Sequence, residues 1–556
     1  MRVTLTSFGG LIPRYSRHHL GAIQASVAHD VKLRNGRLEA WRELCDYAAV
    51  PPTRRSFALH GCCALSWDEL VTMAEVSPDW GRVYISGRKP QLEAVVVDPC
   101  TCDMEYFYVG VPAPMSPPIA ATGETCDRDT DSRAYVYTYI NQWFEESAPS
   151  PPSNVVRVAD GVSVSVSGIA LPPDGYGIVG AKIYRASTGF REDNVKTQKP
   201  VTDFQFVGIH YFPSTTFVDT VKGIGLGEVL ETEKVRMPPP CLQQVVSLDG
   251  VVRLAGFYKN KVFLSENFQL HNWPVKYDLT LNHNIVHMGQ QDRKLYITTD
   301  SIPYIVDASG CEDLKCTPVF TGDTPLPDIG CLYQSGAIMT PHGYVYSSPL
   351  GVILFSENTK WVILTARWLS EDDWRQVLPE TARFAYWEGF LFIATDMVTL
   401  LLDINGDPYG DMDKAELSTL SDRPVDMKVS RTGQLFFMQD GHISVWNTGD
   451  ELRKFVWESR ELTGGNHNPQ ESIPTAAPAY GSTWSPASAK IRSSDTTFTL
   501  STPLQPVAYT RKVVTDDPFR LPRVGRHLWY KIKLEGTDPV EFAELGTSHF
   551  TVNAGE

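Results

Sequence analysis

The sequence predicts an all-β protein, an irregular β-propeller with an inserted immunoglobulin or fibronectin type III-like sandwich and short helices near the N-terminus. Three observations predict this fold. The 556 residues include 39 prolines and 41 glycines and are 11% aromatic, which is typical of many short strands and turns. Paired apolar strands recur between residues 255 and 450, and residues 133–235 contain strands in which apolar and polar residues alternate.

Residues 1–132 are predicted to form an N-terminal segment that contributes strands to the propeller or to a platform beside it. Residues 22–31 carry small and apolar side chains at helical spacing before the turn signal Asn35-Gly36, and residues 67–75 suggest a second short helix. The four prolines and the Thr-rich acidic run within residues 111–132 predict an extended linker.

Residues 133–235 are predicted to form the sandwich. Tyr135, Tyr137 and Tyr139 fall on one face of a strand, as expected where one side of an antiparallel sheet is buried. Six or seven short strands follow within about 100 residues, which is the strand count of an immunoglobulin-like domain. Pro238-Pro-Pro240 marks the end of this region.

Residues 236–460 are predicted to form the propeller blades. Each repeat is an apolar strand, a short polar turn and a second apolar strand, and the repeats are 33 to 50 residues apart, close to the period of propeller blades. The aromatic anchors of the five visible repeats are Phe263, Tyr296, Tyr346, Phe392 and Phe436. A closed ring could borrow strands from residues 56–110, which would make the sandwich an insertion. Residues 461–556 are predicted to be β-rich loops and closing strands.

The charge is unevenly distributed along the chain. The net charge is −15, but residues 1–60 contain nine Lys and Arg against four acids, so they carry +5 and the remainder carries −20. An acidic body argues against tight binding of DNA, because that affinity comes mainly from neutralising phosphates. The ten cysteines show no paired Cys-x-x-Cys spacing, which indicates reduced, mostly buried thiols rather than a zinc site.

One acidic loop is a weak candidate for a metal site. Asp403, Asn405, Asp407 and Asp411 offer oxygen ligands at alternating positions, as a calcium loop does, although Pro408 stands where the EF-hand needs glycine. An acidic loop between blades is therefore the preferred interpretation. No nucleophile elbow, P-loop or His-Glu-x-x-His helix occurs, so we predict no enzyme, no catalytic residue and no cofactor. No run of about 18 apolar residues occurs, so no membrane span is expected.

Several separated phrases resemble the tail nozzle proteins of short-tailed bacteriophages, a family also called tail tubular protein B. They are Phe8-Gly-Gly10 with Pro13-Arg14 and Asn35-Gly-Arg-Leu38, Arg82-Val-Tyr-Ile-Ser-Gly87, residues 135–150 with Lys182-Ile-Tyr-Arg185, Val456-Trp-Glu-Ser459 and Trp529-Tyr-Lys-Ile-Lys-Leu-Glu-Gly536. The sequence departs from the family at Trp143-Phe144, where a small residue is usual, and in its cysteine content.

The resemblance implies a structural virion protein made in the bacterial cytoplasm. It would form a ring, expected to be a hexamer, at the distal end of the tail, and the ring would enclose the channel through which the genome leaves. Its expected partners are further copies of itself, the tail adaptor ring, tail fibre or other tail proteins, and phage double-stranded DNA that passes without tight binding. An acidic lumen would repel phosphates, which suits such passage. The basic N-terminal segment is the expected assembly contact, through Pro13, Arg14, Arg17, Arg34 and Arg37.

Two alternatives remain open from the sequence. The first is a host-recognition component of the same tail, which should bind whole cells as an isolated domain. The second is a propeller protein that binds or hydrolyses polysaccharide. The second alternative requires two convergent carboxylates, and a chain with 65 acidic residues cannot be judged on that point by sequence.

Overall fold

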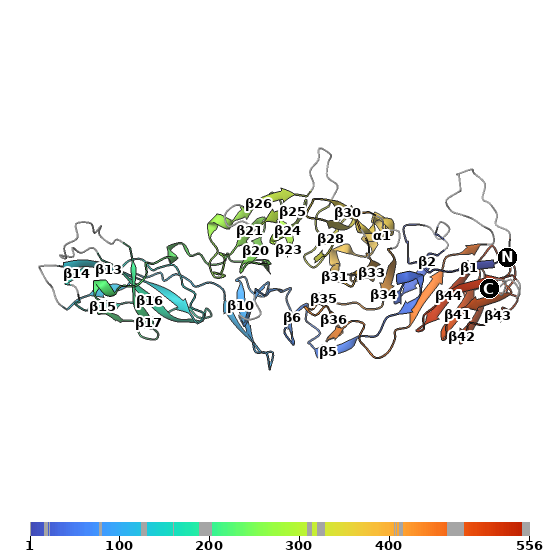
Figure 1. Ribbon diagram of the computed structural model, residues 1–556, viewed down its shortest axis with the longest axis horizontal. Coiled ribbons are helices and arrows are strands. Elements are labelled where there is room, and N and C mark those ends of the chain that lie inside the picture. Colours follow the sequence, from blue (N-terminus) through green and yellow to red (C-terminus); the bar gives the residue numbers. More distant parts are fainter. Residues whose placement is uncertain are drawn as a thin grey trace. The chain divides into compact units, whose positions relative to one another are not determined.

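The computed structural model of the chain is shown in Figure 1. It describes residues 2–15, 20–21, 23–76, 81–123, 130–159, 161–187, 203–308, 314–319, 329–404, 406, 408–410, 415–463 and 483–547. The chain forms two compact units: unit 1 comprises Met1–Glu69, Tyr296–Ile305 and Thr317–Glu556, and unit 2 comprises Leu70–Leu295 and Val306–Cys316. The described part is almost entirely β, with one α-helix, α1 (Glu371–Gln376), so the all-β prediction is confirmed.

Unit 2 contains two blade-like sheets of four antiparallel strands, each ordered as in the sequence. The first consists of β8 (Thr72–Ala74), β9 (Arg82–Ser86), β10 (Glu93–Val97) and β11 (Met104–Tyr108). The second consists of β19 (Gln244–Ser247), β20 (Leu254–Tyr258), β21 (Lys261–Leu264) and β22 (Leu279–Thr280). Strand β8 packs against β19, and one apolar core that includes Tyr84 and Phe263 serves both sheets. Two blades that are neighbours in space are thus separated in the sequence by more than 100 residues.

Those intervening residues form two further sheets in unit 2. Strands β12 (Ile119–Ala121), β15 (Val164–Ser167) and β18 (Phe217–Asp219) make the first. Strands β14 (Val156–Ala159), β13 (Thr130–Asn141), β16 (Ile178–Ser187) and β17 (Gln205–Tyr211) make the second, in that order. Tyr135, Tyr137 and Tyr139 point into the core between them, as their alternation predicted. The first strand of this part, β12, precedes the predicted boundary at residue 133.

A further blade consists of β23 (Ile285–Gln291), β24 (Lys294–Thr299), β25 (Tyr304–Asp307) and β26 (Lys315–Pro318), and here the chain passes between the two units. Unit 1 continues with β27 (Ala337–Thr340), β28 (Gly343–Ser348), β29 (Gly351–Phe355) and β30 (Trp361–Ile363), and then β31 (Arg383–Trp387), β32 (Phe390–Ala394), β33 (Thr399–Asp403) and β34 (Leu417–Leu420). The repeated apolar phrases are the middle strands of these blades.

The last blade of unit 1 is completed by the N-terminal segment. Strands β35 (Asp426–Val429), β36 (Leu435–Gln439) and β37 (His442–Val445) pair with β5 (Cys45–Ala49) as the outer strand. The first strands β27, β31 and β35 pack successively against one another, and β35 packs against the hairpin of β6 (Ser56–His60) and β7 (Cys63–Trp67). Residues 45–49 and residues 426–445, which are far apart in the sequence, therefore share one sheet.

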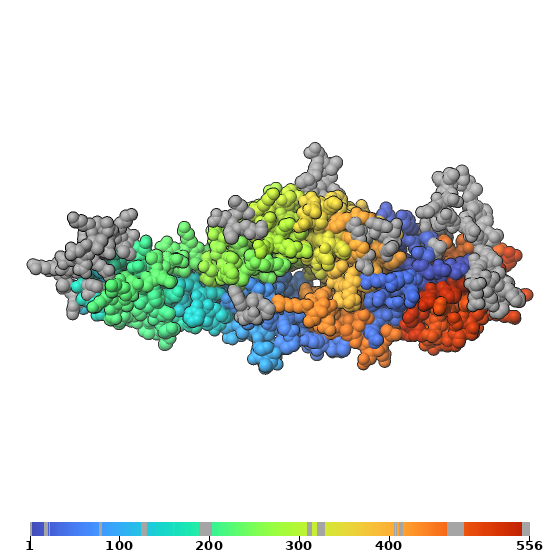
Figure 2. Space-filling view, in the orientation of Figure 1, coloured from blue at the N-terminus to red at the C-terminus, as the bar shows by residue number. Residues whose placement is uncertain are grey.

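The two ends of the chain meet in unit 1. Strand β2 (Ala25–His29) pairs in parallel with β34 and antiparallel with β38 (Phe455–Ser459), and the sheet continues through β44 (Trp529–Gly536), β41 (Thr496–Ser501) and β42 (Tyr509–Val513), with β39 (Leu462–Thr463) pairing β44. A second sheet contains β1 (Arg2–Leu5), β45 (Ala543–Gly546), β40 (Ser488–Ile491) and β43 (Phe519–Arg520), and β3 (Val31–Lys32) pairs with β4 (Glu39–Ala40). In Figure 2 the blue N-terminal residues of unit 1 lie between its orange and red ones.

Both predicted N-terminal helices are wrong. Residues 22–31 contain β2, because the small side chains of Ala25 and Ala28 let this segment pack flat between β34 and β38. Residues 67–75 hold the end of β7 and all of β8. In the described N-terminal segment the helical structure is one turn of 3-10 helix, Arg34–Gly36, where Asn35 has a positive φ of 71° as its turn signal predicted. Helix α1 was not predicted, although Ser370 and Asp373 form a capping box at its start.

The prediction for the cysteines is also wrong in part. Cys63 and Cys102 each take part in a disulfide, whereas Cys45, Cys62, Cys100, Cys241, Cys316 and Cys331 are reduced. Of those six, four are exposed and Cys331 is buried, and burial raises the pKa of its thiol to about 11. Cys126 and Cys311 lie outside the described residues. Spacing along the chain could not reveal these states, because a disulfide depends on the distance between Cβ atoms in the fold. None of the helices described here is long and apolar enough to cross a bilayer.

Candidate functional site: the seat of the N-terminal segment

The N-terminal segment is held by close backbone contacts at Gly9-Gly10. The Gly9 N–H donates to Ile23 O at 2.7 Å, and the Leu11 N–H donates to Leu417 O at 2.8 Å. A Cβ at Gly10 would lie only 2.3 Å from Leu417 O, so glycine is required for this approach to β34. The glycine pair thus fixes the segment to the blade β31–β34.

Phe8 connects the same segment to the end of the chain. Its ring meets Trp457 edge to face, with centroids 4.9 Å apart, and the Trp457 Nε1–H donates to Gly9 O at 3.0 Å. Both aromatic side chains are buried in the core between the two terminal sheets. The opening phrase Phe8-Gly-Gly10 and the closing phrase Val456–Ser459 are therefore in direct contact.

Two of the predicted assembly arginines bind groups of their own chain. Arg34 donates through Nε and Nη2 to the two carboxylate oxygens of Asp403, at 3.1 and 3.2 Å, and its guanidinium stacks 4.0 Å from the centroid of Phe390. Arg14, next to Pro13, donates its backbone N–H to Trp368 O at 2.8 Å and a guanidinium N–H to Ala366 O.

Arg37 and Arg17 complete the predicted set. Arg37 remains half exposed and lies 3.8 Å from Glu541, a distance at the loose end of the ion-pair range. Arg17 lies outside the described residues. Among the predicted arginines that the structure describes, Arg37 therefore makes the weakest contact within its own chain.

The candidate metal loop is only partly within the described residues. Asp403 is described, whereas Asn405, Asp407 and Asp411 are not. The Arg34 fork occupies both oxygens of Asp403, so this carboxylate is already neutralised by a side chain of the same unit. The described residues hold no group of three or more His, Cys, Asp or Glu placed to bind a metal ion.

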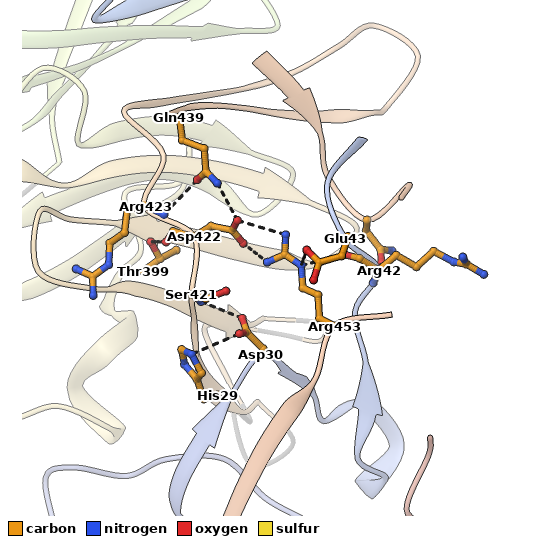
Figure 3. Close-up of polar contacts among 11 residues, drawn as sticks. His29, Asp30, Arg42, Glu43, Thr399, Ser421, Asp422, Arg423, Gln439 and Arg453 are labelled. Carbon is orange, nitrogen blue, oxygen red and sulfur yellow. Dashed lines mark hydrogen bonds and ion pairs between the residues drawn. The ribbon is translucent and has the colours of Figure 1, made fainter. Parts of the chain in front are cut away.

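A polar cluster lies beside this seat, which we call the polar junction: the buried Asp30, Asp422 and Arg453, the partly buried Gln439 and the exposed Glu43 (Figure 3). Arg453 and Asp422 form a two-point ion pair, and their side chains are only 4% and 6% exposed. The Gln439 amide donates to Asp422 Oδ1 at 3.0 Å. The Arg453 Nε–H faces Glu43 at 3.3 Å and donates to Arg42 O at 3.1 Å.

The N-terminal segment contributes the other half of the polar junction. Asp30, whose φ is +50°, accepts the Ser421 N–H at 2.9 Å. His29 lies 3.4 Å from Asp30 through Nε2 and 3.0 Å from Thr419 Oγ1 through Nδ1. The junction thus joins four stretches of chain: residues 29–43, the turn after β34, the end of β36, and the segment between β37 and β38. Its buried charges are matched by hydrogen bonds, which suits it to holding these stretches together.

A second polar contact lies within unit 2. It joins the blade-like sheet β8–β11 to the part formed by the three-stranded and four-stranded sheets of residues 119–219. Arg82 of β9 pairs with Glu145 at 2.6 Å and stacks 4.5 Å from the Trp143 ring. Trp143 also meets Phe107 of β11 edge to face at 5.1 Å. Trp143 therefore packs against the blade. His271 is buried nearby, 3.9 Å from Glu145, and burial lowers its pKa below the usual value.

Sequence reasoning missed the polar junction. Asp422 and Arg453 stand in no recognisable motif, and their partners come from strands far apart in the chain. The one available signal was the turn sequence Ser421-Asp-Arg-Pro424 directly after an apolar strand, which marks a place where an acidic side chain can accept backbone hydrogen bonds.

Comparisons with known proteins assign no family. No family model matches the chain, and no curated protein matches it. Among solved structures, Sqt1 of Saccharomyces cerevisiae aligns with a TM-score of 0.28 at 8% identity, covering 66% of this chain and 81% of Sqt1. PorZ of Porphyromonas gingivalis aligns with a TM-score of 0.26 at 10% identity, covering 84% of this chain and 72% of PorZ. Scores this low carry no argument about function, so the interpretation depends on the residues themselves.

Proposed function

We propose that this chain is a structural protein of a short phage tail, where copies form the distal nozzle ring around the channel for the genome. The observation that carries the proposal is the meeting of separated family-like phrases in one place. Phe8-Gly-Gly10 packs on Trp457, and Val456–Ser459 pairs with β2 on one side and with β44, which is the phrase Trp529–Gly536, on the other. Phrases with a shared structural role are expected to converge in this way.

The unit 2 phrases support the same proposal. Tyr135, Tyr137 and Thr138 of β13 pair with Arg185, Ile183 and Lys182 of β16, so the two most specific phrases are neighbouring strands. Glu146 folds back over them and accepts hydrogen bonds from Thr138, Lys182 and Tyr184 at 2.6 to 2.7 Å.

We propose that the three- and four-stranded sheets are the inserted immunoglobulin or fibronectin type III-like sandwich, because the order β14-β13-β16-β17 matches the larger sheet of that fold. The blade-like sheets would be the irregular propeller that carries it. In the same proposal the ring is a hexamer bound to the tail adaptor ring, with tail fibres or other tail proteins beside it, and double-stranded DNA passes an acidic wall without tight binding.

The test is to locate the chain in particles. A phage genome encoding this chain with a small affinity tag would be grown, and purified virions would be labelled with gold against the tag and imaged. Gold at the distal end of the tail supports the proposal. Virions that contain none of the chain, or gold confined to the capsid, contradict it. Gold on lateral fibres would favour the host-recognition alternative.

A further inference from the structure

The segment Arg520–His527, which we call the arginine loop, carries three arginines at three-residue spacing: Arg520, the last residue of β43, and Arg523 and Arg526, which lie between β43 and β44. All three are exposed. Between them Leu521 is buried and Val524 packs against the core of the terminal sheets. The apolar side chains therefore fasten the loop while the guanidinium groups remain at the surface.

Hydrogen bonds hold the arginine loop in one conformation. The Leu521 N–H donates to Ala487 O at 2.8 Å, and His527 and Trp484 exchange two backbone hydrogen bonds at 3.1 Å. The buried Tyr530 hydroxyl donates to Gly525 O at 2.7 Å, and Gly525 has a φ of +89°. A loop that is already ordered loses little conformational entropy when it binds a partner.

The loop is a basic island in an acidic chain. Residues 509–533 contain seven Lys and Arg against Asp516 and Asp517, so they carry +5 and the rest of the chain carries −20. Three residues span at most about 10 Å. The Cα atoms of neighbouring arginines are thus at most about 10 Å apart, slightly more than the screening length of about 8 Å at physiological salt, so their potentials overlap in part.

The lysines around the loop are neutralised by carboxylates. Lys512, Lys531 and Lys533 pair with Asp495, Glu458 and Glu535 at 2.8 to 3.0 Å. Within the described residues no carboxylate forms an ion pair with Arg520, Arg523 or Arg526; the Arg526 guanidinium donates to Thr483 O at 2.8 Å. These three exposed guanidinium groups, whose geometry fits carboxylates, therefore have no carboxylate partner within the described residues, and Arg526 is held by a backbone carbonyl.

We infer that the arginine loop docks on an acidic surface of a second copy of this chain. This inference rests on the proposed ring and names its contact. Charge complementarity favours it, because a second copy presents −20 outside its own basic segment, whereas that same charge repels DNA. A basic loop that binds a different surface of the next copy makes a head-to-tail contact, which is the kind that closes into rings.

The test compares two triple variants of the full chain by native mass spectrometry and sedimentation. R520E/R523E/R526E should weaken self-association at least about tenfold, because three attractive charges become repulsive. The control R157E/K222E/K234E changes the net charge by the same amount at exposed sites in unit 2 and should leave self-association within about twofold. Equal weakening by both triples would overturn the inference, since net charge alone would then be the cause. Unchanged assembly of the loop variant would also overturn it, and would leave the nozzle proposal standing if gold still marks the tail tip.

A conservative variant locates the partner surface. Arg523→Lys keeps the charge and supplies an amine for zero-length coupling to a carboxylate. In a mixture of isotopically light and heavy copies, a light–heavy crosslink from position 523 to an Asp or Glu supports docking between copies. Crosslinks confined to one copy contradict it. A mobility-shift assay with double-stranded DNA tests the other possible partner. If the wild type retards DNA, the loop triple variant does not, and the oligomers of the two proteins are the same, the inference is overturned and the partner of the arginine loop is a nucleic acid.

Discussion

The pair Asp422 and Arg453 shows how much can depend on one charged contact. Both side chains are almost fully buried, and Asp422 also accepts from Gln439 while its backbone carbonyl accepts from Thr399 at 2.6 Å. A buried ion pair gains little over an apolar pair of the same shape, but it becomes costly when one partner is lost. The pair therefore adds little to stability while both residues are present, but loss of either residue leaves the other as a buried charge without its partner.

Arg453→Met should destabilise unit 1 by about 3–5 kcal/mol, because it leaves the Asp422 carboxylate buried without its cation. Urea unfolding followed by tryptophan fluorescence measures the loss. The matched control is Arg383→Met, which removes a pair with Asp396 whose side chain is 57% exposed, and it should cost less than about 1 kcal/mol. Equal costs for the two variants would show that the polar junction is no stronger than a surface pair.

His271 predicts a pH effect in unit 2. Burial lowers its pKa in the folded state, although Glu145 opposes this, while Arg82 adds to it and Glu146 opposes it. A group whose folded pKa lies below its unfolded value gives stability that is complete above about pH 6.5 and is lost as the pH falls through the lowered value. Between pH 7.5 and pH 5, the hydrogen-exchange protection factors of β9 and β21, which are corrected for the slower intrinsic exchange at acidic pH, should fall more in the wild type than in His271→Gln. The same fall in both proteins would assign the effect to other groups.

At the scale of elements, strand β2 joins parts that are distant in the sequence. It carries the sheet from blade strand β34 to the terminal strands β38 and β44, so removal of the first 30 residues would divide this sheet. The Gly9-Gly10 approach to Leu417 sets the position in which β2 enters the sheet.

Gly10→Ala should displace β2, since the new Cβ would collide with Leu417 O, and overpacking of this kind costs about 1–3 kcal/mol. Limited proteolysis should then cut between Gly10 and Ala25 faster than in the wild type. Gly123→Ala is the control, because nothing lies within 4 Å of its added Cβ. If Gly10→Ala is cut no faster than the wild type, the added Cβ is accommodated without displacing β2.

The elements also show what the sequence could and could not predict. Middle blade strands such as β32 and β33 are buried on both faces, so they read as continuous apolar runs and were found. The sequence predicts a helix where β2 forms, because Ala25 and Ala28 satisfy helical spacing as well as a flat sheet. The polar junction cannot be predicted from the sequence, because Asp30, Asp422 and Arg453 are brought together by strand pairing between segments that no local pattern connects.

At the scale of the whole molecule, charge is the property that bears on assembly. The acidic excess of the chain is interrupted by two basic regions, residues 1–60 and 509–533. Deleting residues 1–50 cannot test the first region, because the deletion also removes β2 and β5 from their sheets. Substitutions at exposed arginines separate folding from assembly.

Arg37→Glu is the sharpest of these substitutions, because Arg37 is half exposed and its pair with Glu541 is long. The free energy of unfolding of the variant should lie within about 1 kcal/mol of the wild-type value, as expected for a surface ion pair. The variant should nevertheless enter rings and virions less efficiently if the N-terminal segment contacts a neighbouring copy or the adaptor ring. Arg492→Glu is a matched control, since Arg492 also pairs with Glu541, at 3.1 Å. Quantitative western blots of purified particles give incorporation. A defect in Arg37→Glu alone places the assembly contact at the N-terminal segment, whereas equal incorporation of both variants removes Arg37 from it.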